Sequence, residues 1–232
     1  MNKLKQYFIT TNQGEYREGE VHRFCQSIKI SYPIQAATLT ATALGVYEIN
    51  INSEKVGDQL FAPGFTYYHR DLFYQTYDVT AQLQVGDNQL DAWLGQGWYA
   101  GRFTHENLTQ IYGEQTAISW VLQVTYADGT EEQFVSDEKV EEYTSKYSYA
   151  GFYDGEIYDA TATEQRIGTA QHYSGKIPEN LEKTLIPVKL QEEMHVHQVT
   201  EKDGKTILDF GQNFAGMLEI DPSYLNGKAT IN

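Results

Sequence analysis

The chain has 232 residues, of which 41% are hydrophobic and 13% aromatic, so it can bury enough apolar surface to fold. Its 32 acidic and 17 basic residues give a formal net charge of -15, which repels phosphate backbones and anionic lipid and argues against a nucleic-acid partner. Cys25 is the single cysteine, so no intrachain disulfide forms, and a buried structural thiol is the favoured interpretation.

No segment has the apolar length of a secretion signal or a membrane span, which favours a cytoplasmic protein without a membrane partner. Residues 1–35 mix charges, glycines and a proline with short apolar stretches such as Phe24 to Ile30, and we expect an irregular lead-in with one strand. From Ala36 onward the pattern changes, and Tyr47, Ile49 and Ile51 alternate with polar neighbours as in a strand. Asn52-Ser53 then predicts a hairpin turn, because Asn tolerates positive φ.

Farther along, Thr80 is expected to cap a short helical turn, and residues 86–88 predict the turn before a strand at 90–94. Apolar and polar residues alternate over 118–126, and Asp128-Gly129 predicts a hairpin back through residues 130–135. Sustained helical periodicity is missing from the sequence. The sequence therefore predicts an all-β fold, with a jelly-roll or β-sandwich domain over residues 36–176.

Pro178 and Pro187 bracket a polar stretch, and we expect a linker over residues 177–187. Residues 188–232 again have the pattern of strands but are too few for an ordinary independent core. We therefore expect the chain to end inside a second, truncated β-sandwich domain.

Residues 95–102, Gly-Gln-Gly-Trp-Tyr-Ala-Gly-Arg, join three glycines to two aromatic rings and a cation at the end of a predicted strand. Trp98 and Tyr99 could stack on the face of a sugar while Arg102 donates hydrogen bonds to its hydroxyls. The alternative interpretation is that Trp98 fills the core and contacts no ligand.

Residues 153–159 place three carboxylates and two phenols on an expected loop. Asp154, Glu156 and Asp159 could bind a hard cation such as calcium or hydrogen-bond a polyol, although the spacing is not that of an EF-hand, and a solvated turn is the alternative. His195 and His197 could share one face of a strand, but no third metal ligand follows at a diagnostic spacing. The sequence contains no nucleophile elbow, P-loop, dinucleotide fingerprint or HExxH helix, so no cofactor is required.

Seven short blocks stand out along the chain: ALGVYE at 43–48, IN at 51–52 with VGD at 56–58, APGFT at 62–66, YQTYDVT at 74–80, LGQGWYAG at 94–101, YDGEIYDA at 153–160 and DFGQNFAG at 209–216. In this order they resemble the N-terminal region of bacterial α-L-rhamnosidases. The resemblance covers most of the chain after residue 36.

The resemblance implies a multidomain glycoside hydrolase, in which β-sandwich modules precede an (α/α) barrel that hydrolyses terminal α-L-rhamnosides with inversion. We therefore expect a fragment that is inactive alone, packs against the catalytic domain of the same polypeptide and could contact a rhamnose-containing glycoside or oligosaccharide. Similar domains include rhamnose-binding modules, some with calcium. On that resemblance the carbohydrate-binding candidates are Trp98, Tyr99, Arg102, Asp154, Glu156 and Tyr158, and the calcium candidates are Asp154, Glu156 and Asp159; no catalytic residue is expected.

Two positions depart from the family pattern, because Ser53 replaces the usual Gly after Asn52 and Phe65 replaces the usual Trp. Three other interpretations stay open. The chain could be an autonomous, calcium-assisted rhamnose-binding module, or a purely structural domain in which Trp98 and Tyr158 are buried. It could also be a sugar-binding jelly roll from a β-galactosidase-like enzyme, although that interpretation does not explain residues 209–216.

Overall fold

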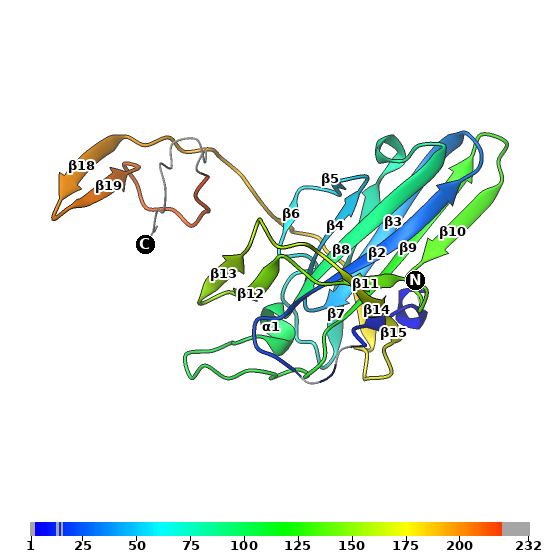
Figure 1. The fold of residues 1–232 in the computed structure, drawn as a ribbon, viewed down its shortest axis with the longest axis horizontal. Helices are drawn as coiled ribbons and strands as arrows, with labels where there is room; N and C mark the ends of the chain where they lie inside the picture. The colour runs from blue at the N-terminus through cyan, green and yellow to red at the C-terminus, as the bar shows by residue number, and fades with distance from the viewer. Residues whose placement is uncertain (1–2, 13, 15, 220–232) are drawn as a thin grey trace. The chain divides into compact units, whose positions relative to one another are not determined.

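The computed structural model describes residues 3–12, 14 and 16–219, and nearly all of its regular structure is β-strand (Figure 1). The all-β prediction is confirmed. The helical segments of these residues are short, namely η1 (Leu4–Gln6), η2 (Thr80–Gln82) and α1 (Gly97–Ala100), and none of them has the length and apolarity to cross a membrane. The chain divides into two compact units, Met1–Lys189 and Leu190–Asn232.

The larger sheet of the first unit has the strand order β15-β1-β9-β3-β7-β16 among the described residues, and β10 pairs with β9 outside that order. Its pairs are antiparallel except for β16, which runs parallel to β7. The strands are β1 (Ile9–Thr10), β3 (Ile34–Leu44), β7 (Asp71–Asp78), β9 (Ala117–Tyr126), β10 (Glu131–Val135), β15 (Gln171–His172) and β16 (Asn180–Lys183).

The second sheet has the order β14-β11-β2-β8-β4-β5 and is antiparallel throughout the described residues. Its strands are β2 (Val21–Ile30), β4 (Val46–Ile51), β5 (Glu54–Lys55), β8 (Gly86–Gly95), β11 (Glu141–Tyr143) and β14 (Arg166–Thr169). Two smaller pairs complete the first unit: β12 (Tyr147–Gly151) with β13 (Gly155–Tyr158), and β6 (Gln59–Leu60) with β17 (Val188–Lys189).

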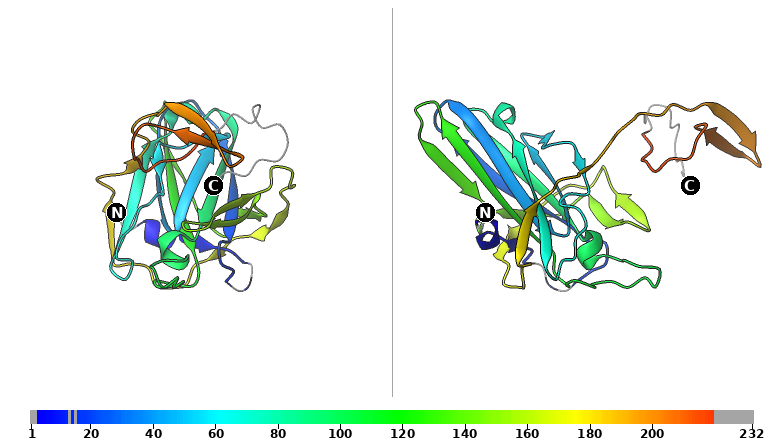
Figure 2. Two further views of the ribbon diagram at one scale, coloured as in Figure 1. Left: turned by 90° about the vertical axis from the view of Figure 1, so that its left-hand side faces the viewer. Right: turned by 180° about the vertical axis from the view of Figure 1, so that it is seen from behind.

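The two large sheets face each other as a sandwich, and Figure 2 shows these layers from two further sides. Because side chains alternate along a strand, each sheet turns one apolar face inward. One core cluster contains Phe24 of β2 and Leu90 of β8 together with Leu39 of β3 and Trp120 of β9. The Trp120 indole is fully buried and its Nε1 donates to Oε1 of Gln26 across the sandwich, at 2.9 Å.

Two predicted hairpins are confirmed. β10 pairs back on β9 after the turn at Asp128-Gly129, and β5 pairs back on β4 after Asn52-Ser53. Both turn residues of the second hairpin have positive φ, 51° for Asn52 and 69° for Ser53, so the turn closes without a glycine. The expected cap at Thr80 is wrong: its Oγ1 instead accepts from the Ala37 backbone N–H and donates to Asp78.

The irregular lead-in with one strand expected over residues 1–35 is corrected, because β1, β2 and the start of β3 all lie there and belong to the two large sheets. Over ten residues β2 pairs with β8 in the interior of the six-stranded sheet, and Phe24 and Ile28 point into the core. Phe8 is also fully buried. The sandwich therefore begins well before residue 36.

The expected linker over residues 177–187 also belongs partly to the first unit. β16 lies within it and pairs with β7, while the Thr184 backbone N–H donates to the carbonyl of Tyr74 at 3.1 Å. The described part of the second unit forms one hairpin, β18 (Gln198–Lys202) with β19 (Lys205–Asp209), whose side chains are exposed.

Candidate functional site

The short helix α1 places the Gly-Trp-Tyr motif at the end of strand β8. Gly97 has φ of +52°, and a Cβ built there would lie 2.6 Å from Cγ1 of Val46 and 3.2 Å from its backbone nitrogen. A larger residue at 97 would therefore have to displace β4 or α1. The glycine allows the chain to turn out of the sheet immediately before Trp98.

Trp98 belongs to a group of five aromatic side chains from three separate loops, which we call the aromatic patch. Its members are Phe61, Phe65, Trp98, Phe103 and Phe152. The ring centroids of Trp98 and Phe152 are 4.5 Å apart, and those of Phe61 and Phe152 are 5.4 Å apart. Phe65 contacts Trp98 at 5.9 Å and Phe103 at 5.6 Å. The loops are therefore joined by ring contacts rather than by strand pairing.

The aromatic patch is open to solvent over much of its area. Phe61, Phe65 and Phe152 are 42%, 46% and 40% exposed, whereas Trp98 is half-buried among them. Contiguous exposed apolar surface of this kind commonly marks an interaction site in a soluble domain. Trp98 is thus neither a fully buried core residue nor a freely exposed ring.

Tyr99 points the opposite way, into the core. It is 4% exposed, packs with Phe8 and Leu72 in the second core cluster, and its hydroxyl lies 3.4 Å from that of Tyr173. Burial raises the pKa of the Tyr99 hydroxyl, and the contact with Tyr173 adds to the shift. This location does not fit the sequence-based expectation that Tyr99 offers a ring face to a sugar.

Arg102 follows Trp98 by four residues, and Asp154 follows Phe152 by two. The side chains of Arg102 and Asp154 form an ion pair between the two loops. Asp154 also accepts a hydrogen bond from the Tyr149 hydroxyl at 2.9 Å, and the Arg102 guanidinium lies 5.7 Å from the centroid of the Tyr153 ring. The hydrogen bond from Arg102, reinforced by that from Tyr149, lowers the pKa of Asp154. The structure therefore joins the two segments that carry the candidates, through the Arg102–Asp154 ion pair and the packing of Phe152 on Trp98.

The remaining candidates lie farther along the β12–β13 hairpin. Tyr158 is exposed and packs on Tyr147 with ring centroids 4.9 Å apart. Burial raises the pKa of Tyr147, and the charge of Glu156 adds to the shift. Asp159 accepts hydrogen bonds from the backbone and hydroxyl of Thr161, which lower its pKa. Tyr158 pairs with Tyr147 at the open end of the hairpin, whereas Asp154 lies in the turn at its tip.

Over the described residues, no three His, Cys, Asp or Glu side chains gather as a metal site would require. Asp154 is engaged by Arg102, and Asp159 by Thr161. In the second unit, His195 is exposed and lies 3.9 Å from Glu193. A bound calcium ion stays a prediction from the family resemblance.

The pKa of Asp154 is shifted in the direction opposite to that of an acid catalyst. A general acid in a glycosidase needs a carboxyl whose pKa is raised, whereas Arg102 lowers the pKa of Asp154 and keeps it ionised. The rings supply apolar area, and the ion pair supplies hydrogen-bonding groups beside it. Sequence reasoning missed Phe61, Phe103 and Phe152, although each lies in a loop within three residues of a glycine, where an aromatic ring has no strand partner.

Curated relatives of this chain are α-L-rhamnosidases. The chain is 36% identical over 199 residues to the enzyme of Streptomyces avermitilis, covering 81% of this chain and 19% of that protein. It is 32% identical over 222 residues to an enzyme of Formosa agariphila, covering 88% and 23% of the two chains. The chain thus spans about a fifth of the length of the relatives that it matches.

Solved structures give the same result. The α-L-rhamnosidase of Aspergillus terreus superposes with a TM-score of 0.81 at 29% identity, over 90% of this chain and 26% of that one. The S. avermitilis enzyme complexed with L-rhamnose superposes with a TM-score of 0.74 at 31% identity, over 83% and 20% of the two chains. The family profile of the α-L-rhamnosidase N-terminal domain matches residues 32–205, and the chain therefore belongs to that family.

Proposed function

We propose that this chain is a non-catalytic domain of an α-L-rhamnosidase and that its aromatic patch packs against another part of the enzyme, in keeping with the family assignment. The observation that carries the proposal is the exposure of three phenylalanines around Trp98, namely Phe61, Phe65 and Phe152. Phenylalanine has no hydrogen-bonding group, so such a surface is better suited to a protein interface than to a sugar alone. The Arg102–Asp154 pair supplies a polar rim of the kind that surrounds interface cores.

Calorimetry of the full-length enzyme that carries this domain tests the proposal. If the patch packs against a neighbouring domain, replacing Phe61 and Phe152 by Ser separates the unfolding of this domain from that of the rest. The isolated chain should keep nearly the same melting temperature, because both rings are already partly exposed. Val85→Ser, at an exposed turn outside the patch, is the control. Cooperative unfolding that survives the double substitution contradicts the proposal.

A second function is contact with the rhamnoside substrate at the same region. The observation that favours it is the position of a guanidinium and a carboxylate beside the half-buried Trp98 ring, a combination that can stack on a sugar and hydrogen-bond its hydroxyls. The related S. avermitilis enzyme was solved complexed with L-rhamnose. Calorimetric titration of L-rhamnose into the chain, with galactose as control and with or without calcium, decides this. Heat specific to rhamnose that is lost in Trp98→Ala supports it, and no heat under either condition excludes it.

A further inference from the structure

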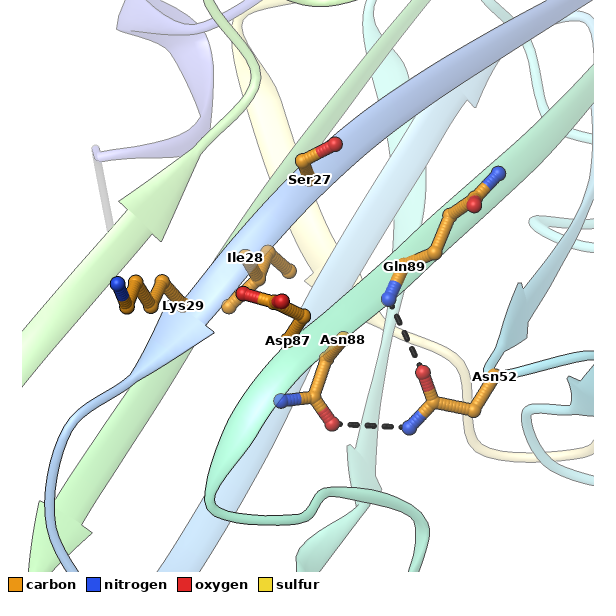
Figure 3. A pocket seen from close by; sticks show the side chains of 7 residues that line it. All are labelled: Ser27, Ile28, Lys29, Asn52, Asp87, Asn88 and Gln89. Atoms are coloured by element: carbon orange, nitrogen blue, oxygen red, sulfur yellow. Dashed lines mark hydrogen bonds between the residues drawn. The ribbon is translucent and has the colours of Figure 1, made fainter.

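The outer face of the six-stranded sheet contains a cavity distinct from the aromatic patch. Strands β2 and β8 lie side by side there, and in their backbone register Ser27 is opposite Gln89 and Lys29 is opposite Asp87. The cavity has a volume of about 490 Å³. Figure 3 shows these four side chains around it together with Ile28, Asn52 and Asn88. That volume is within the range of small-molecule sites, roughly 300 to 1,000 Å³.

One side of this cavity is held rigidly by two amides. Asn52 donates from Nδ2 to Oδ1 of Asn88 at 2.8 Å and to the carbonyl of Gln82 at 2.9 Å, and its Oδ1 accepts from the Gln89 backbone at 3.0 Å. Asn88 donates from Nδ2 to the carbonyl of Gln84 at 2.7 Å. These amides are occupied by the protein itself, so they fix the geometry of the turn and leave recognition to their neighbours.

The neighbouring polar groups are available. Among the described residues, the side chains of Ser27, Lys29 and Asp87 make no hydrogen bond or ion pair, and all three are exposed. Gln89 uses its Nε2 to reach Oδ1 of Asp91 at 3.1 Å, which orients the amide and leaves its oxygen as an acceptor. The cavity therefore presents a hydroxyl, an ammonium, a carboxylate and an amide oxygen at fixed strand positions.

We propose that this cavity is a binding site for a neutral saccharide. Sugar hydroxyls both donate and accept, which matches a wall that carries both kinds of group. Lys29 and Asp87 balance each other in charge, and the chain's net charge of -15 disfavours an anionic ligand. Beyond Gln89, the same face of strand β8 is covered by Arg23, which pairs with Asp91 and lies 5.4 Å from the centroid of the Trp93 ring, so the cavity ends at Gln89.

The experiment measures binding of the 232-residue chain to an array of neutral oligosaccharides, with sialylated and sulfated glycans as the acidic arm. Ser27→Trp fills the cavity, and Asp87→Ala removes one acceptor; each should weaken binding of the neutral glycans by at least about tenfold. Glu131→Ala is the matched control, because it removes the same charge from an exposed strand of the other sheet. Circular dichroism verifies that each variant is folded.

The proposal is supported if neutral glycans bind to the chain, lose affinity in Ser27→Trp and Asp87→Ala, and retain it in Glu131→Ala and Trp98→Ala. It is overturned if no neutral glycan binds, if only acidic glycans bind, or if the affinity is unchanged in both cavity variants. Binding that is lost only in Trp98→Ala also overturns it, and that outcome instead favours the substrate contact at the aromatic patch.

Discussion

The guanidinium of Arg102 and the carboxylate of Asp154 form an ion pair that joins the loop after α1 to the tip of the β12–β13 hairpin. Phe152, two residues before Asp154, packs on Trp98 in the same region. The pair and the ring contact together hold the hairpin against the aromatic patch. Changes at Arg102 should therefore affect the hairpin more than the sandwich.

Replacing Arg102 by Gln should increase amide hydrogen exchange over residues 151–157 while changing the melting temperature little. Partly exposed ion pairs add little to global stability, yet this one is a main polar contact of the hairpin tip. The control is Arg70→Gln, which removes an exposed arginine that pairs with its own neighbour, Asp71. Unchanged exchange in the hairpin of Arg102→Gln contradicts this account of the ion pair.

The same contact gives a dependence on pH. Arg102 lowers the pKa of Asp154, so the stabilisation is present above the ordinary aspartate pKa of about 3.9 and is lost as the pH falls through the lowered folded value. Hydrogen exchange of the hairpin, corrected for intrinsic rates, should therefore rise below about pH 4. Asp154→Asn should abolish this dependence. If the protection of the hairpin from exchange falls equally in Asp154→Asn, the pH dependence comes from a titrating group other than Asp154.

The two tryptophans Trp120 and Trp98 should differ in their effect on stability. Trp120 is fully buried and hydrogen-bonded to Gln26, so Trp120→Ala should cost about 3 to 5 kcal/mol of the free energy of unfolding. Trp98 is half-buried in the exposed patch, and Trp98→Ala should cost clearly less. Urea denaturation of both variants measures the difference. Equal losses would show that Trp98 acts as a core residue, as the purely structural interpretation holds.

The conformation of Gly97 should be required for the position of Trp98. Gly97→Ala should cost about 1 to 3 kcal/mol, because the new methyl group meets Val46, and should shift the fluorescence of Trp98. Gly129→Ala is the control: φ there is also positive, at +83°, but nothing lies within 4 Å of the added carbon. Its cost should be that of backbone strain alone, about 1 kcal/mol. Equal costs would remove the argument for a steric requirement at 97.

Much of the sandwich could be predicted from its alternation. Apolar residues recur at every second position from Ile118 to Tyr126, and the structure places these alternate members in the core. One strand was expected within residues 1–35, but the length and central place of β2 were not, because Arg23 and Lys29 interrupt its apolar pattern. Arg23 lies on the outer face, where it pairs with Asp91 and Glu164, so its charge is compatible with a central strand.

The candidate site was only partly predictable. Trp98, Arg102 and Asp154 were selected because their chemistry suits a sugar, and the structure brings them together. Phe61 and Phe152 carry no such chemical signal, and they are distant in sequence. They meet only because the loops that carry them converge beside α1, and loop conformations have no periodicity from which to predict that convergence.

Hydrogen exchange at the aromatic patch, compared between the isolated chain and the full-length enzyme that carries it, tests the central claim most directly. If the patch packs against the rest of the enzyme, the amides of residues 61–65, 98–103 and 151–153 should exchange several-fold more slowly in the full-length protein. The exposed β9–β10 turn at Asp128-Gly129 should exchange equally in both and is the internal reference. Equal exchange of the patch in the two proteins would contradict the claim that it is an interface.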